Sequence, residues 1–173
     1  MSSLSNEARS LTWLVNNFVA EVPGVTDAVV VSADGLVLIA SDGLPDDRAQ
    51  HLAAVASGIN GLGEGLSSLF NMGSPKQTIV RMKKGYVIVM AISDGSCQAT
   101  LAGPDCDMKV VGYQMTLLVE NSGHVLTPRL RQELRSEMVH DSRSALSPQR
   151  PGSRHSQYRG PRRGMAGRER RQP

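Results

Sequence analysis

Three tight-turn signals constrain the fold of this chain most strongly, because each lies between two short aliphatic runs. They are Asp34-Gly35, Lys84-Gly85 and Asp94-Gly95. Aliphatic and β-branched runs on both sides of such a turn are typical of β-hairpins. The sequence therefore predicts five short strands. They span residues 25–32, 36–41, 77–83, 86–92 and 96–102.

Helical periodicity fills the segments around these strands. Residues 4–22 form an amphipathic pattern, with Ser5 as the expected N-cap and Pro23-Gly24 as the stop. Two further helices are expected at 45–70 and at about 105–121, and Thr127-Pro128 restarts a polar turn or short helix that ends near Val139. The predicted fold class is therefore α+β, a sheet packed with helices in the order α-β-β-α-β-β-β-α.

The predicted helix 45–70 has two apolar sides of different character. One is a stripe of large residues at helical spacing: Leu52, Val55, Ile59, Leu62, Leu66 and Leu69. The other is a face of small residues: Ala49, Ala53, Ala56, Ser57, Asn60, Gly61, Gly63 and Gly65. Each glycine inside a helix lowers helix stability by about 1 kcal/mol relative to alanine. The presence of several glycines in this segment therefore requires an explanation. Either the helix ends near Gly58, or the small side chains let a second helix approach across a two-fold axis.

The sequence offers no recognisable catalytic or ligand-binding motif. None of its four histidines pairs with Cys, His or carboxylates at a metal-ligand spacing. The glycine-rich run 58–65 lies inside or late in a helix, whereas a dinucleotide-binding fingerprint lies between a strand and the start of a helix. A P-loop string is absent as well. We therefore expect no enzymatic activity, no cofactor and no metal.

Charge divides the chain into an acidic part and a basic tail. Residues 1–140 carry 10 Lys and Arg against 14 Asp and Glu, whereas residues 141–173 carry nine Arg, no Lys and two acids. The expected organisation is one domain at 1–140 and a disordered Arg-rich tail at 141–173. Such a tail could bind nucleic acid, anionic lipid or an acidic protein by electrostatics, or it could be a solubilising extension. No stretch reaches the roughly 18–20 apolar residues of a membrane span, and the two cysteines indicate a reduced cytoplasmic protein.

Several strings, in this order, resemble the roadblock/dynein light chain family. The aliphatic run, Asp-Gly turn and second run at 25–36 resemble its first hairpin. The string Gly85-Tyr86-Val87-Ile88-Val89-Met90 resembles its central strand. The strings at 11–14, 55–58, 92–96 and 104–107 resemble actinobacterial members, which are encoded beside a small GTPase. The resemblance covers roughly residues 9–137.

This resemblance implies a profilin-like five-stranded antiparallel sheet sandwiched by helices, and a homodimer. Family members pair through the second helix and the third strand. The implied interface residues are Ala49, Ala53, Ala56, Ser57, Asn60, Gly61 and Gly63 on the helix, with Thr78, Val80 and Met82 on the edge strand. The strand 77–83 would then be an edge that pairs with its twin.

The resemblance also implies a function, because bacterial gliding-polarity relatives bind a Ras-like small GTPase and can accelerate its hydrolysis. We expect a non-catalytic regulator or scaffold of such a GTPase, with Asp46, Arg48 and Glu64 as candidate contacts. Two alternatives stay open. One is a small-ligand sensor, which needs a cavity between sheet and helix. The other is nucleic-acid or anionic-surface binding through the tail, against which the acidic domain and the scarcity of aromatic stacking platforms argue.

Overall fold

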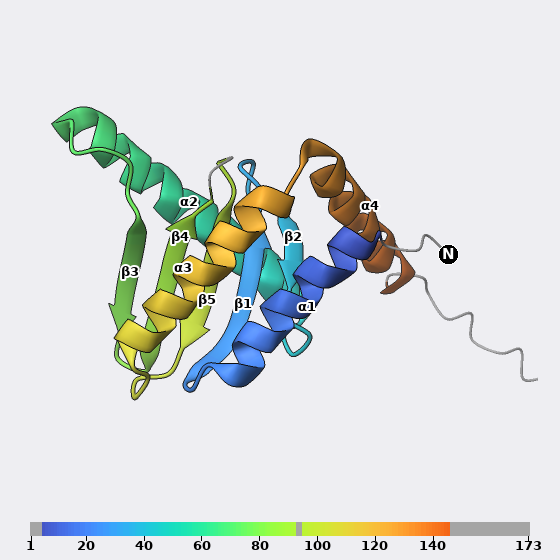
Figure 1. Ribbon diagram of the computed structural model, residues 1–173, viewed down its shortest axis with the longest axis horizontal. Helices are drawn as coiled ribbons and strands as arrows, with labels where there is room; N and C mark the ends of the chain where they lie inside the picture. Colours follow the sequence, from blue (N-terminus) through green and yellow to red (C-terminus); the bar gives the residue numbers. More distant parts are fainter. Residues whose placement is uncertain (1–4, 93–94, 146–173) are drawn as a thin grey trace, which may run out of the picture.

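A five-stranded antiparallel sheet with helices on both faces forms the protein, and the computed structural model describes residues 5–92 and 95–145, with side chains through His140 (Figure 1). Its elements in chain order are α1 (Asn6–Glu21), β1 (Val25–Val31), β2 (Val37–Ala40), α2 (Asp46–Phe70), β3 (Gln77–Met82), β4 (Gly85–Ala91), β5 (Cys97–Ala102), α3 (Met108–Val125) and α4 (Pro128–Ala145). The strand order across the sheet is β2-β1-β5-β4-β3. The predicted fold class is confirmed.

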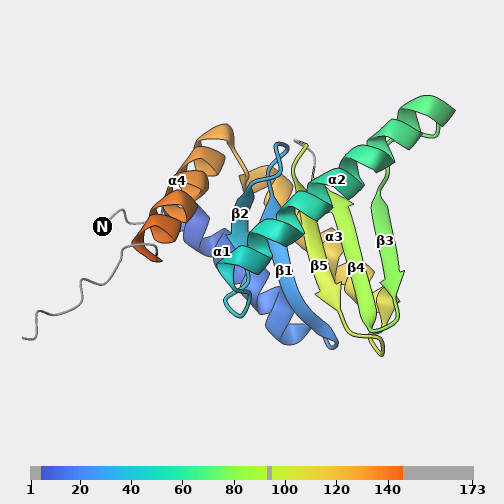
Figure 2. The ribbon, with the colours of Figure 1, turned by 180° about the vertical axis from the view of Figure 1, so that it is seen from behind.

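The helices cover the sheet unequally. Helices α1 and α3 lie side by side on one face, and α2 crosses the other face diagonally (Figures 1 and 2). Helix α4 lies beside β2, which is one of the two edge strands. At the other edge, the end of α2 projects past β3 (Figure 2).

Each face of the sheet has its own apolar core, because alternate residues of a strand point to opposite faces. On the α1/α3 side, Leu11 and Val15 of α1 and Met115 of α3 are fully buried against Val30 and Ile88. On the α2 side, Val29, Val31 and Ala99 form the sheet surface under the helix. Strand β4 is buried along most of its length, as its uninterrupted apolar sequence predicts.

The first hairpin turn shows why the Asp-Gly pattern is needed. Gly35 has a φ of +81°, a left-handed conformation that favours glycine. The Ser32 backbone N–H donates to the Leu36 carbonyl, and the Ser32 hydroxyl accepts from the Leu36 N–H at 3.1 Å. A Cβ on Gly35 would lie 3.3 Å from the Ser57 side chain, so this turn packs directly on α2.

Helix α2 runs unbroken for 25 residues through its glycines, which excludes the alternative that it ends near Gly58. Its last residue is Phe70, and the C-cap Asn71 has the left-handed φ of 55° common after helix C-termini. Packing against the segment before β3 explains why position 63 is a glycine. A Cβ there would lie 3.0 Å from the Pro75 ring, so the bare backbone lets the segment before β3 fold against the helix.

Two differences from the predicted elements lie at the C-terminal end. Helix α3 passes through Gly123 and ends at Val125, and α4 is longer than the predicted turn or short helix and runs to Ala145. Thr127 starts α4, because its hydroxyl accepts a hydrogen bond from the Leu130 N–H at 3.2 Å. The predicted domain boundary at residue 140 therefore falls inside this helix. The predicted disorder of the tail beyond Ala145 lies outside the described residues.

Candidate interaction surfaces

The side of α2 that faces the sheet is the small-residue side. Ala49, Ala53 and Ala56 have no exposed surface and pack against Val29, Val31 and other residues of the inner sheet surface. Because a methyl group is short, alanines let the helix backbone lie close to the valine-rich strands. These three alanines therefore have no surface left for a partner, and their predicted place at the dimer interface is corrected.

The large apolar residues of α2 are instead largely exposed. The exposed fractions of Leu62, Leu66 and Leu69 are 73%, 57% and 78%, and Val55 is 55% exposed. The last turn and the following segment add Phe70 and Met72, which are exposed as well. This leucine flank extends along the end of α2 that projects past β3 (Figure 2). A continuous row of exposed leucines is uncommon on a monomeric protein and is typical of an interaction site.

The edge strand β3 adds a second apolar element next to this flank. It pairs only with β4, so its outer edge has no strand neighbour within the described sheet. Val80 and Met82 point to the α2 side and are 37% and 50% exposed, whereas Ile79 points to the α1/α3 side, as does its pairing partner Ile88. A groove of about 510 Å³ runs between α2 and β3, and its lining is mainly apolar. The lining includes Ile59, Leu62, Leu66, Pro75, Thr78 and Val80. We call the exposed side chains of Leu62, Leu66, Leu69, Phe70, Met72, Val80 and Met82 the α2–β3 surface.

The remaining predicted interface residues of α2 lie at different places around the helix. Ser57 is partly buried beside the Gly35 turn, and Gly63 contacts the segment before β3. Gly61 is exposed with open space where a Cβ would be, and Asn60 is half-buried. The structure thus does not gather the small residues of α2 into one exposed face. Sequence reasoning missed the leucine flank as the free side, although its periodicity was visible.

The three residues predicted to face a GTPase do not form one cluster. Asp46 and Arg48 are exposed at the start of α2, where a carboxylate is stabilised by the positive end of the helix dipole. Glu64 lies in the last third, about 27 Å along the helix axis from Asp46. There it accepts a hydrogen bond from the Ser74 hydroxyl at 3.4 Å.

Two chemical features of the described part of the chain are the placement of its metal-ligand side chains and the pKa of the Cys97 thiol. No group of three or more His, Cys, Asp or Glu side chains among the described residues is placed to hold a metal ion. Burial raises the pKa of the Cys97 thiol from 9.0 to about 11, which disfavours the thiolate that a nucleophile needs. None of the helices in the described ranges is both long and apolar enough to cross a bilayer.

Three grooves on the described surface lie at the edges of the sheet or between helices and are open to solvent. One groove lies at the β3 edge, one between α1 and α3, and one at the β2 edge. A small-ligand sensor of the kind considered from the sequence needs a site enclosed between sheet and helix, so no specific observation favours it.

Known proteins share this arrangement. The family model for the Roadblock/LC7 domain matches residues 11–102. A solved Roadblock/LC7 domain from Streptomyces avermitilis is 37% identical, with a TM-score of 0.63 over 67% of this chain and 98% of that chain. A second structure from this organism is 38% identical, with a TM-score of 0.51 over 64% and 96% of the two chains.

The fold is also similar to that of MglB from Myxococcus xanthus. The TM-score is 0.64 at 9% identity, over 72% of this chain and 93% of that chain. No curated protein matches the chain.

Proposed function

The chain belongs to the Roadblock/LC7 domain family, and we propose that it is a homodimeric, non-catalytic regulator or scaffold of a Ras-like small GTPase in the cytoplasm of an actinobacterium. The observation that carries this proposal is the α2–β3 surface. It combines an unpaired edge strand with a flank of exposed leucines, and both need a partner.

A second copy of the chain fits this surface on both counts. Antiparallel pairing of β3 with its twin would extend the sheet across a two-fold axis and satisfy the open edge. The same axis would bring the projecting end of each α2 over β3 of the other copy, so that leucines enter the groove beside Thr78 and Val80.

The free energy available from burying apolar side chains favours this pairing. Fully burying one large aliphatic or aromatic side chain stabilises by about 1.5–3 kcal/mol. The α2–β3 surface presents seven such side chains: Leu62, Leu66, Leu69, Phe70, Met72, Val80 and Met82. Even partial burial of that set is comparable with the cost of association, which is about 4–15 kcal/mol.

The dimer leaves the outer side of each α2 for the GTPase. Gly58, Gly61 and Gly65 lie along this side, and nothing is within 4 Å of where their Cβ atoms would be. Bare backbone allows close approach of a partner helix or switch loop. Asp46 and Arg48 remain candidate polar contacts at one end of this side, and Glu64 is a candidate near the other.

Binding and turnover assays with the small GTPase encoded nearest to this gene test the proposal. The GTPase is loaded with GDP or with a non-hydrolysable GTP analogue, captured with the full chain, and then assayed for hydrolysis. We expect binding that depends on the nucleotide. Faster hydrolysis would identify an activating regulator, and unchanged hydrolysis a scaffold. Absence of binding in both nucleotide states would refute the proposal.

A further inference from the structure

A second groove lies at the opposite edge of the sheet from the α2–β3 surface. It has a volume of about 450 Å³ and is bounded by β2, by the segment that leads into α2, and by residues 134–140 of α4. Leu38, Ile39 and Ala40 of β2 form one wall, and Leu134, Glu137 and Met138 of α4 form the other. We call it the β2 groove.

Two properties of the β2 groove point to the chemistry of its occupant. Strand β2 is an edge strand that pairs only with β1, and α4 packs along its outer side, so the groove lies between the strand and the helix. The carboxylates of Asp42, Asp46 and Glu137 surround the groove, and no described cation forms an ion pair with them. A groove bordered by carboxylates without an ion-pair partner fits a peptide segment that carries positive charge.

We propose that the β2 groove binds the chain's own Arg-rich segment, residues 146–173. Residues 134–140 of α4 form a wall of the groove and the helix ends at Ala145, so the segment starts about 8 Å along the helix axis from this wall. The segment contains eight of the nine arginines that follow residue 140. Its 28 residues could span about 90 Å when extended, which is far more than a return to the groove requires.

The basic residues of this segment are of the type that binds carboxylates best. They are all arginine and none is lysine. A guanidinium group presents a planar set of donors that can bind a carboxylate through two hydrogen bonds, whereas a lysine ammonium acts as a point charge. Tethering beside the groove gives a millimolar effective concentration, so modest contacts suffice.

Trypsin digestion of the full chain tests this proposal, because the segment carries the cleavage sites and the groove carries the mutations. The variant is Asp42→Asn, Asp46→Asn and Glu137→Gln, which removes the three carboxylates and leaves every tryptic site unchanged. The matched control is Asp27→Asn, Asp105→Asn and Glu120→Gln, which removes three carboxylates outside the groove. The readout is the rate of cleavage after Arg154 and Arg159, followed by intact mass spectrometry.

At low salt, we expect cleavage in the wild type and the control to be about tenfold slower than in the groove variant, since several weak contacts act together. Sodium chloride at about 0.5 M should remove the difference by screening. Equal rates in wild type and groove variant would overturn the proposal. Protection that disappears on dilution would also overturn it, because the occupant would then be the segment of a second molecule.

Discussion

The glycines of this protein differ in how much space surrounds them. For two of them, replacement by alanine should change the free energy of unfolding in opposite directions. Gly85 begins β4 with a φ of +152°, and a Cβ there would lie 2.3 Å from the Ala102 carbonyl oxygen. Gly58 lies in helix α2 with nothing within 4 Å. We expect Gly85→Ala to lower the free energy of unfolding by more than about 2 kcal/mol. Gly58→Ala should raise it by about 0.5–1 kcal/mol.

Urea unfolding of both variants measures these changes. The pair separates backbone strain from helix propensity because the same methyl group is added in each case. A Gly85→Ala protein as stable as the wild type would contradict the close approach of β4 to β5 at that position.

Cys97 predicts a pH dependence of stability. Burial raises the pKa of its thiol from 9.0 to about 11, so the folded protein holds the proton more tightly than the unfolded chain. This contribution is fully present below about pH 9 and is lost as the pH rises toward 11, by at most about 2 kcal/mol. Urea unfolding between pH 8 and pH 10.5 should therefore show a steeper loss of stability for the wild type than for Cys97→Ala. Parallel slopes would refute the assignment to this thiol.

At the scale of elements, α2 carries the strongest prediction about assembly. Its leucine flank is exposed on the protomer, whereas its alanine side is buried against the sheet. The double variant Leu62→Arg and Leu66→Arg would place two charges in the proposed dimer interface, so we expect a folded monomer. Ala54→Arg is the control, because Ala54 is exposed and does not line the groove beside β3.

Light scattering after size exclusion measures the mass, and circular dichroism checks that both variants fold. A Leu62→Arg and Leu66→Arg protein that is still dimeric would mean that the leucine flank is not the interface. A monomeric Ala54→Arg protein would mean that the outer side of α2 takes part in self-association.

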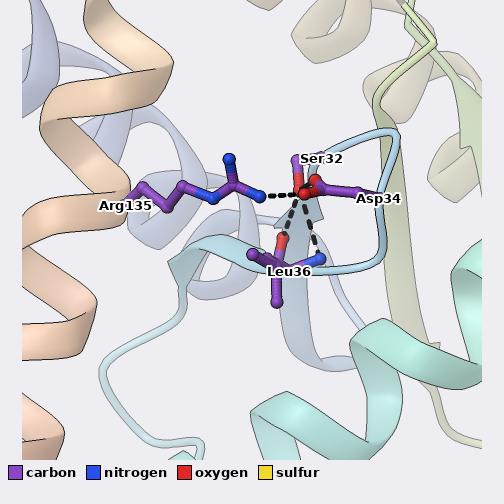
Figure 3. A network of polar contacts seen from close by, with 4 residues as sticks. All are labelled: Ser32, Asp34, Leu36 and Arg135. Atoms are coloured by element: carbon purple, nitrogen blue, oxygen red, sulfur yellow. Dashed lines mark hydrogen bonds and ion pairs between the residues drawn. The ribbon is translucent and has the colours of Figure 1, made fainter.

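Helix α4 is held by two kinds of contact whose energies differ. Arg135 forms an ion pair with Asp34, which also contacts the Ser32 hydroxyl at the first hairpin turn (Figure 3). The side chains of this pair are 44% and 56% exposed, so its contribution should be below about 1 kcal/mol. Leu130 and Leu134 are buried at 1% and 3% exposure, and replacing one by alanine costs about 2–5 kcal/mol.

We therefore expect Leu134→Ala to lower the free energy of unfolding several times more than Arg135→Ala. Chemical denaturation of the two variants measures the comparison, and the double variant Arg135→Ala with Asp34→Ala isolates the pair. A larger effect of Arg135→Ala than of Leu134→Ala would show that the ion pair is the main anchor of α4.

At the scale of the whole molecule, the two edges of the sheet differ in whether a helix covers them. The β3 edge is open and apolar, whereas α4 packs along β2 at the other edge. A sheet that can extend at only one edge forms closed pairs and not chains. The protein should therefore keep the mass of a dimer as its concentration rises.

Release of α4 from β2 should allow assembly beyond the dimer. Leu130→Asp together with Leu134→Asp would place charges in the contact between α4 and the rest of the protein and free the β2 edge. Sedimentation velocity should then detect species larger than a dimer, at concentrations where the wild type shows none. A variant that unfolds is distinguished by its circular dichroism. A folded variant that stays dimeric would mean that the β2 edge does not need α4 for protection.

The sequence by itself determined the elements and the fold class. Turn signals such as Asp34-Gly35 and the Ser5 cap act within a few residues of the chain, so their effect does not depend on distant contacts. Helix α1, the five strands and the unbroken α2 therefore lie close to where the pattern predicts them.

Only the tertiary structure decided which side of α2 faces the sheet. Leucines and alanines both recur at helical spacing, so periodicity alone is ambiguous, and the exposed leucines look like core residues. Which side of α2 faces the sheet depends on how closely the helix approaches the valine-rich strands and on the length of the helix. A 25-residue helix is about 37 Å long, whereas five strands span about 20 Å, so α2 must project past the sheet.

The role of α4 was likewise decided by packing. Its sequence is mostly polar, and the importance of Leu130 and Leu134 appears only once they lie beside β2 and α1. A thin apolar stripe stabilises a helix only where another surface buries it, because short helices are marginal in water on propensity alone. That surface is assembled from segments far apart in the chain, so no local pattern could reveal it.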